Sequence, residues 1–312
     1  MVDNNKLHLL ISIAKLYYLE NMNQNEIANL LGVSRPLISK YLMEARNLGV
    51  VKIEINDLLT SDNVEDDLSE RICKKFNLKD IYIIPSSTNK DLNDQMFVDY
   101  ATEYILGTFK DNFLLGIGWG SVIGAIIKKI DNFEPKRKLI GDVVPLISNA
   151  PISFRNYHTN ELVRMLAEAT GLNAQYLYAP VICSTPSERE IFLNTDNVKG
   201  VMDMYERLDY VVIQIRNFPS VPDLATEARF EKKLHQEKAV GMLLGYYYDI
   251  NGNVIQSDMD YSIQIPIDSL KKAKKVIGII NTRVNSTAAI GAINLGIFTD
   301  IIISDNVAKE LL

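Results

Sequence analysis

Residues 24–43, QNEIANLLGVSRPLISKYLM, combine basic and hydroxyl side chains with a regular apolar pattern. When the apolar positions face inward, Arg35, Ser39 and Lys40 remain on the outer side of a helix. Arginine and lysine can bind guanine edges or phosphates, and serine can contact either a base or the DNA backbone. The chemistry predicted for this face is therefore binding to double-stranded DNA.

The residues around this face predict a helix-turn-helix unit. The positions where its two helices face each other or the core are apolar: Ile27, Leu31, Val33, Ile38 and Tyr41. Ala28 is small where the helices cross closely, and Gly32 can adopt the positive φ that the turn requires. Ser34 is the expected N-cap of the second helix, and Pro36 fits its first turn, where a missing N–H costs little.

The outer face of the second helix is the part of such a unit that enters the major groove. Gln24 starts the first helix, and we expect it to bond a backbone phosphate through its side chain and its free helical N–H. The predicted DNA-binding residues are Gln24, Ser34, Arg35, Pro36, Ser39, Lys40 and Met43. The alternative interpretation is an ordinary helix pair within a helical domain.

The charge distribution permits binding to DNA although the net charge of the chain is −6. Residues 1–56 hold six Lys/Arg and five Asp/Glu, so they carry +1, and the remainder carries −7. Binding to phosphates depends on the local face and not on the total charge. Because +1 is modest, we expect a single copy to bind weakly. An oligomer that presents two such helices to a two-fold operator would bind more tightly through effective concentration.

Composition and length restrict the class of protein. The chain has 312 residues and is 47% hydrophobic and 23% charged, which excludes a mostly disordered or fibrous protein. The sequence contains no run of 18 uninterrupted apolar residues, so we expect no transmembrane helix. The N-terminus lacks the features of a secretory signal. Two cysteines and three histidines are too few and too scattered for a disulfide framework or metal site. We therefore expect a cytoplasmic protein without metal or cofactor.

Beyond the first 50 residues the pattern changes. Residues 50–55 alternate as in a strand or hairpin arm, 56–63 form a linker, and a connecting helix begins at Val64. Apolar runs typical of strands lie at 81–84, 113–117, 139–147, 175–178, 209–215, 275–280 and 300–303. Helical stretches are expected at 94–110, 120–130, 158–170, 186–207, 226–240 and 286–295. This alternation predicts an α/β domain with a largely parallel sheet, and residues 250–253 predict a hairpin turn.

A glycine-rich loop follows the apolar run 113–117 and opens a helix. Its candidate ligand-binding residues are Gly116, Gly118, Trp119, Gly120 and Ser121. Glycines expose backbone N–H groups, and a helix N-terminus favours an anion, so a bound phosphate or carboxylate is the natural hypothesis. The loop is not the dinucleotide-binding fingerprint, because Ser121 stands at the third glycine position. The alternative is a tight strand–helix turn with a packed Trp119.

The motifs together resemble the SorC family of bacterial, sugar-responsive transcriptional regulators. The resemblance is carried by IAKLYYLENMNQNEIANLLGVSRPLISKYLMEARNLGVVKIEI in the first domain, and by HTNELVRMLAEATG, LYAPVICSTPSERE, LGYYYDINGNVI and AAIGAINLGIFTDIIISDNVAKELL beyond it. It implies a winged helix-turn-helix domain at 1–56 and an effector and oligomerisation domain at 57–312, with 57–78 as linker and linking helix. It also implies that the second domain is related to sugar-phosphate isomerases and binds a phosphorylated sugar without turning it over. The resemblance further implies that the protein forms dimers or tetramers and binds palindromic operators.

The chain departs from the SorC pattern at strand ends, where open α/β sheets bind ligands. Gln214-Ile215-Arg216 stands where members usually have Gly-Ile-Gly, and Gly241-Met242 where they usually have Gly-Asp. Members usually have a loop that contains Gly-Gly and a lysine where this chain has residues 281–286. They also have a pair of glycines where this chain has Ser148-Asn149. We infer an altered pocket in which Arg216 and Arg283 could clamp an anion. The candidate effector-binding residues are Gly116, Gly118, Trp119, Gly120, Ser121, Gln214, Arg216, Met242, Arg283, Asn285 and Ser286.

Three alternatives for the second domain stay open. It binds the effector usual for the family, it binds a different small molecule, or bulkier side chains fill the pocket and it binds none. A sugar-phosphate isomerase or deaminase is a further alternative, but enolisation needs a general base beside the sugar. The pocket-forming loops offer Arg, Asn, Ser and Met without an evident Asp, Glu or His dyad. The sequence therefore predicts a regulator, not an enzyme, whose partners are operator DNA and a small effector.

Overall fold

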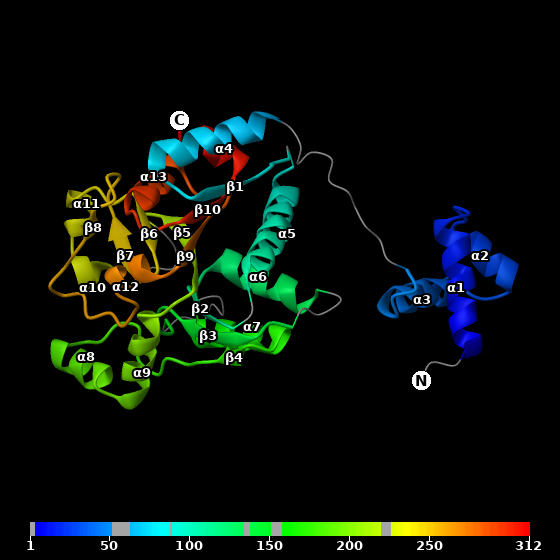
Figure 1. The fold of residues 1–312 in the computed structure, drawn as a ribbon, viewed down its shortest axis with the longest axis horizontal. Helices are drawn as coiled ribbons and strands as arrows, with labels where there is room; N and C mark the ends of the chain where they lie inside the picture. Colours follow the sequence, from blue (N-terminus) through cyan, green and yellow to red (C-terminus); the bar gives the residue numbers. More distant parts are fainter. Residues whose placement is uncertain are drawn as a thin grey trace. The chain divides into compact units, whose positions relative to one another are not determined.

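A computed structural model describes residues 4–51, 63–87, 89–110, 112–133, 138–150, 158–219 and 226–312. The chain divides into two compact units, residues 1–61 and 62–312, and each is described by itself (Figure 1). The predicted domain boundary after residue 56, residues 52–55 of the expected strand and residues 56–62 of the linker lie outside the described residues. The boundary and the wing therefore remain predictions.

Within residues 4–51, the first unit contains the helices α1 (Asn4–Tyr18), α2 (Gln24–Leu31) and α3 (Arg35–Asn47). Its core is formed by apolar side chains with at most 1% exposure, namely Leu10, Ile13, Ile27, Ile38, Leu42 and Ala45. Gly32 has φ +67° and ends α2 in the left-handed conformation, as the sequence predicted. Leu31 was expected in the core but is 38% exposed. It is the last residue of α2, one turn beyond Ile27 and Ala28, which fill the core contact.

Helix α2 begins with a capping box that the sequence analysis did not identify. The Asn23 Oδ1 accepts hydrogen bonds from the backbone N–H groups of Asn25 at 3.0 Å and Glu26 at 3.1 Å. The Glu26 carboxylate accepts the backbone N–H of Asn23 at 2.8 Å. These bonds satisfy donors that have no partner inside a helix, and so fix where α2 begins.

Removing the cap should loosen α2 locally. Asn23→Ala is expected to cost about 1 kcal/mol, which corresponds to roughly five-fold faster hydrogen exchange of the α2 amides. Asn23→Ser is the matched control, because serine is an equally good N-cap. Equal exchange rates in the two variants would show that the cap does not stabilise α2.

The second unit is built on a largely parallel sheet, as predicted. In the part of the unit that the structure describes, the parallel strands are β1 (Asp80–Ile84), β2 (Phe113–Ile117), β3 (Gly141–Pro145), β4 (Asn173–Ala174), β5 (Tyr210–Asn217), β9 (Lys275–Ile280) and β10 (Asp300–Ser304). They lie in the order β1-β10-β9-β5-β2-β3-β4. The end of β5 continues into an antiparallel extension of β6 (Gly241–Leu243), β7 (Tyr246–Tyr248) and β8 (Val254–Ile255).

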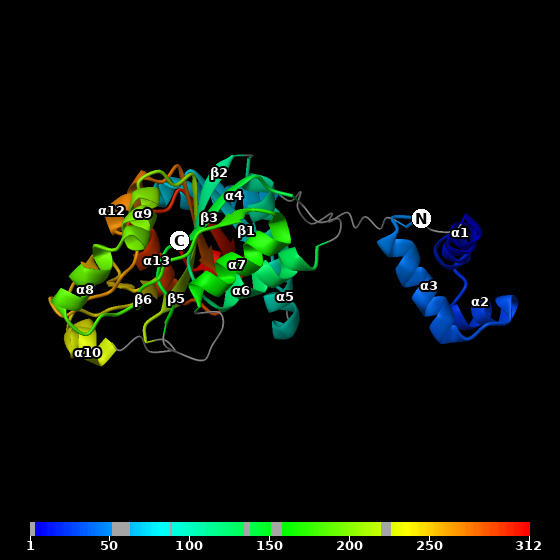
Figure 2. The ribbon, with the colours of Figure 1, turned by 90° about the horizontal axis from the view of Figure 1, so that it is seen from below.

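Helices connect these strands. They are α4 (Asn63–Phe76), α5 (Lys90–Thr108), α6 (Ser121–Asp131), α7 (Thr159–Thr170), α8 (Pro186–Leu193), α9 (Asp196–Tyr205), α10 (Thr226–Phe230), α11 (Lys233–Gln236), α12 (Ile267–Lys272), α13 (Ser286–Asn294) and α14 (Asp305–Lys309). Helix α6 packs against both α5 and α7 (Figure 2), and α14 packs against both α4 and α13. The chain moves from β2 to β3 in one direction along the sheet and from β9 to β10 in the other. Since such crossovers are right-handed, α6 and α13 lie on opposite faces, and the direction reverses between β2 and β5.

Several predicted elements differ from the structure. Residues 175–178 are not a strand, because the Asn160 side chain bonds both the N–H and the C=O of Leu177 at 3.0 Å. The expected helix 186–207 is two helices, since Thr195 caps a new one. The expected helix 226–240 is also broken, with Glu231 at φ +49°. The predicted hairpin turn is confirmed, because β7 and β8 pair on either side of it.

Candidate DNA-binding face and effector site

Helix α3 separates a buried side from an exposed side. Ile38, Leu42 and Ala45 are buried in the core of the first unit. The predicted DNA-binding residues of α3 and its N-cap are all exposed: Ser34, Arg35, Pro36, Ser39, Lys40 and Met43. Pro36 lies in the first turn, as predicted. We call these six residues the outer face of α3.

The electrostatics of this face favour an anion. Glu44 is the one acid in α3, and its carboxylate pairs with Lys6 of α1. The cations Arg35, Lys40 and Arg46 are therefore not opposed by an uncompensated acid on the same helix. Ser34 occupies the N-cap position but its side chain forms no capping bond, so the expected cap is not made.

Gln24 is partly exposed at the start of α2. The capping box occupies the N–H groups of Asn25 and Glu26 and brings the Glu26 carboxylate to this end of the helix. A phosphate here would meet the Gln24 side chain and its own N–H rather than a full set of helical donors. The phosphate contact of Gln24 remains a prediction.

The predicted effector residues lie near the point where the strand order reverses, between β2 and β5. Ligands of open α/β sheets bind outside the carboxyl ends of the strands at such a point. A hollow of about 190 Å³ is present there. Its lining residues are Ser121, Gln214, Ile215, Arg216, Asn217, Pro219, Asn281, Arg283 and Val284. We call it the switch-point hollow, and it contains four of the predicted residues, Ser121, Gln214, Arg216 and Arg283.

Gln214 and Arg216 are both largely buried and lie on one side of β5, because alternate residues of a strand share a face. The Gln214 Oε1 accepts the backbone N–H of Val122 in the first turn of α6 at 3.0 Å. The Arg216 Nη2 contacts the Met242 Sδ at 3.3 Å. Met242 is itself fully buried, so it supports Arg216 from β6 without lining the hollow.

The glycine-rich loop contributes less to the hollow than expected. A Cβ at Gly116 would collide with Leu146, and a Cβ at Gly118 would lie 2.9 Å from the Leu244 Cδ2. Trp119 is 1% exposed. These three residues are not among those that line the hollow, and the geometry matches the tight turn with a packed tryptophan.

The loop after β9 is held by residues that the sequence analysis did not single out. The Asn217 side chain donates to the Arg283 C=O and accepts the Asn285 N–H, each at 2.9 Å. The Arg283 guanidinium pairs with the Asp94 carboxylate of α5. The position of Asn217 at the end of β5 is a signal that could have identified it as a site residue. Asp94 carried no such signal, because it is distant in sequence from Arg283.

Asn285 and Ser286 begin α13 instead of lining the hollow. The Asn285 Oδ1 accepts the Ala288 N–H and the Thr287 hydroxyl, each at 2.8 Å, so Asn285 is a helix cap. Nearby, burial raises the pKa of the Tyr248 phenol well above its usual range, so its hydroxyl stays protonated and donates to the Ala288 C=O.

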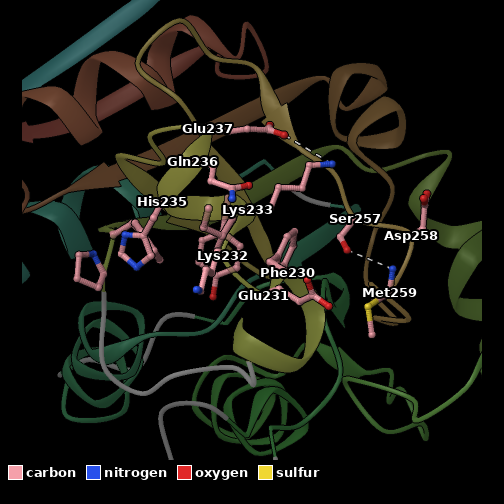
Figure 3. Close-up of a pocket in the computed structure, with 14 residues that line it drawn as sticks. Phe230, Glu231, Lys232, Lys233, His235, Gln236, Glu237, Ser257, Asp258 and Met259 are labelled. Carbon is pink, nitrogen blue, oxygen red and sulfur yellow. Dashed lines mark hydrogen bonds and ion pairs between the residues drawn. The ribbon is translucent and has the colours of Figure 1, made fainter.

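A larger hollow of about 1210 Å³ lies beside α10 and α11 and contains none of the predicted residues (Figure 3). Phe218, Phe230 and Tyr247 contribute its aromatic surface. Its rim carries both signs of charge, including Lys233 and Glu237, which pair at 3.6 Å. Mixed charge on an open rim gives no preference for one class of ligand.

Metal and nucleophile chemistry find no support among the described residues. Within them, no group of three or more His, Cys, Asp or Glu could hold a metal ion. No described helix is long and apolar enough to cross a membrane. Burial, and next the charge of Glu188, raise the pKa of the Cys183 thiol, which keeps it protonated and unreactive.

Residues 63–312 match the protein family described as "Putative sugar-binding domain", which covers well over half of the chain. The chain belongs to this family. The deoxyribonucleoside regulator of Bacillus subtilis (strain 168) is 25% identical over 320 residues, covering 99% of this chain and 99% of that protein. The sorbitol operon regulator of Klebsiella pneumoniae is 24% identical and covers 100% of this chain and 99% of that protein.

A solved structure supports the same architecture for this member of the sugar-binding-domain family. The full-length sorbitol operon regulator SorC from Klebsiella pneumoniae has a TM-score of 0.73 at 22% identity, covering 100% of this chain and 99% of that one. This confirms the predicted fold class. Together with the named relatives, it confirms the resemblance to SorC regulators that the sequence motifs indicated.

Proposed function

We propose that this protein is a sequence-specific DNA-binding transcriptional regulator whose second domain senses a small sugar-type metabolite. The observation that carries the DNA-binding role is the exposed outer face of α3, with Arg35, Ser39 and Lys40 turned away from the core of their unit. The relatives that match the whole chain are named as regulators, which agrees with this role. A cytoplasmic location follows from the proposal, because the operator lies on the chromosome.

The outer face of α3 belongs to one short helix, so a single copy of the protein supplies few phosphate contacts. We propose that a homodimer or homotetramer presents two α3 helices to a palindromic operator, with half-sites about one helical turn of DNA, or a multiple of it, apart. Linking two weak contacts raises the overall affinity through effective concentration. The operator footprint and the mass of the complex would test this arrangement.

The switch-point hollow is the proposed effector site. The names of the two relatives refer to deoxyribonucleosides and sorbitol, and the hollow offers a guanidinium, amides and a hydroxyl for polyhydroxylated molecules. Arg216 would bind the effector directly, and Asn217 would connect it to the loop after β9. We propose that occupancy of the hollow changes operator affinity.

A gel-shift experiment on the full chain tests the proposal. The probe is the DNA upstream of its own gene, with an excess of unrelated DNA as competitor. Specific retardation that changes with one member of a sugar panel supports both parts of the proposed function. Absence of specific retardation at every sugar and salt concentration tested would contradict the DNA-binding role.

A regulator that needs no effector is the second candidate, because Gln214 and the small size of the hollow leave limited space for a ligand. Thermal shift separates the candidates, since a ligand at 100 times its Kd stabilises the folded state by about 2.7 kcal/mol. No stabilisation across a broad sugar panel favours the effector-independent regulator. The enzyme alternative gains no support, since the described lining residues of the switch-point hollow include no Asp, Glu or His to act as a base.

A further inference from the structure

The side chain of Gln214 occupies the place where the N-terminus of α6 would receive an anion. Its Oε1 accepts the Val122 N–H at 3.0 Å, and the whole residue is only 6% exposed. A helix N-terminus attracts anions because its first N–H groups lack partners inside the helix. In this chain a neutral amide oxygen already fills that role.

The fit between Gln214 and the turn before α6 is close. Gly120 has φ +137°, and a Cβ there would collide with the Gln214 amide oxygen and lie 2.8 Å from its Cδ. The glycine therefore leaves the space that the amide fills. An incoming phosphate could not share that space, so it would have to displace the Gln214 side chain.

The backbone around Gln214 leaves little freedom for such a displacement. Strand β5 lies between β2 and β9 in the sheet, and Gln214 is paired in register with Ile279 of β9. Any rearrangement must come from rotation of the Gln214 side chain alone. That rotation would give up a buried hydrogen bond to a helix N-terminus, and breaking such a bond is costly when the N–H is left unsatisfied.

We infer that Gln214 is a specificity-determining residue that closes the N-terminus of α6 to phosphate, so that the switch-point hollow takes a small unphosphorylated sugar or sugar alcohol. The inference rests on the proposed function, because it treats that hollow as the effector site. The remaining polar groups of the hollow suit hydroxyl groups, and they belong to Ser121, Arg216, Asn217, Asn281 and Arg283. The Arg283 guanidinium already has the Asp94 carboxylate as its counter-charge. Its volume of about 190 Å³ is below the roughly 300–1,000 Å³ typical of pockets for drug-sized ligands.

The test compares phosphate binding by the unaltered full-length protein with binding by two full-length variants, Gln214→Ala and Gln214→Glu. Gln214→Ala removes the amide and frees the Val122 N–H, whereas Gln214→Glu keeps an acceptor there and adds a negative charge. Inorganic phosphate is the probe for isothermal titration, with sodium chloride at matched ionic strength as control. Sorbitol and sorbitol 6-phosphate then form a matched pair that reports selectivity.

We expect Gln214→Ala to bind inorganic phosphate at least 10-fold more tightly than the unaltered chain, with no gain for Gln214→Glu. The same substitution should shift the preference within the sorbitol pair at least 10-fold toward the phosphorylated member. Equal phosphate affinity in Gln214→Ala and the unaltered chain would overturn the inference. If Gln214→Ala does not fold, Gln214→Asn, which is one methylene shorter, is expected to show the same gain.

The outcome is separable from that of the proposed function. Operator binding without any ligand depends on the outer face of α3 and is measured independently by gel shift. Loss of specific retardation would contradict the proposed function and leave the phosphate comparison intact. A failed phosphate comparison with normal retardation would overturn only the role of Gln214.

Discussion

Replacing Arg35 and Lys40 together by alanine should weaken operator binding by at least about 30-fold, or roughly 2 kcal/mol. Both side chains lie on the exposed outer face of α3, so neither is expected to support the fold. A side chain that reads a base contributes about 1–3 kcal/mol, and one that contacts a phosphate reduces the salt dependence of binding when it is removed. Titrations at several salt concentrations would distinguish these two roles for each cation.

The matched control is Lys199→Ala, which removes one exposed cation from α9 in the second unit. It should leave operator affinity nearly unchanged, and all variants should keep the thermal stability of the unaltered chain. Full operator affinity in the double variant would show that the outer face of α3 does not contact DNA. A loss of binding free energy in the control that is half of the loss in the double variant would show that only total charge matters, because the control removes one cation and the double variant two.

Asp260→Ala should destabilise the second unit by about 3–5 kcal/mol, because it leaves a buried guanidinium without its counter-charge. Arg229 is 1% exposed, and its Nε and Nη2 contact the two Asp260 carboxylate oxygens at 3.0 and 2.8 Å. The Arg229 Nη2 also donates to the Gly245 C=O at 2.8 Å. The guanidinium lies over the rings of Phe230 and Tyr247, at 4.9 and 5.8 Å from their centroids.

Urea unfolding of the second unit measures this effect. Asp258→Ala is the matched control, since it removes an exposed carboxylate two residues away and should change stability by less than about 0.5 kcal/mol. Replacing both members of the pair, Arg229→Met with Asp260→Leu, should recover much of the loss, because no buried charge remains. Equal stability of Asp260→Ala and Asp258→Ala would contradict the structural role of the ion pair.

The outer face of α3 could be predicted from the sequence because its signals are local. Gly32 and Pro36 mark the turn and the next helix, and the apolar spacing of Ile27 and Ile38 identifies the buried side. The prediction was wrong for Leu31, since periodicity does not show how far along α2 the helix contact extends. The capping box at Asn23 is also a local signal, but it was not predicted because Asn23 lies in a polar stretch that was interpreted only as a break between helices.

The effector site could be predicted only in outline. Strand–helix alternation placed the candidates at the carboxyl ends of parallel strands, where Gln214 and Arg216 indeed lie. The contact between Gln214 and Val122 depends on how β2 and β5 pair across the sheet, and no local pattern encodes that register. The Arg229–Asp260 pair was missed for a similar reason, because it connects α10 with a loop beyond β8.

Site-directed crosslinking tests the central claim most directly. Ser39→Cys places a thiol on the outer face of α3, where a photoactivatable aryl azide can be attached. Burial raises the pKa of both native thiols, Cys73 and Cys183, so labelling at neutral pH favours the exposed new cysteine. Lys15→Cys on the exposed side of α1 provides the comparison position. We predict crosslinks from position 39 to bases within the operator, in two symmetric clusters, and far fewer from position 15. Crosslinks from position 15 with none from position 39 would contradict the account.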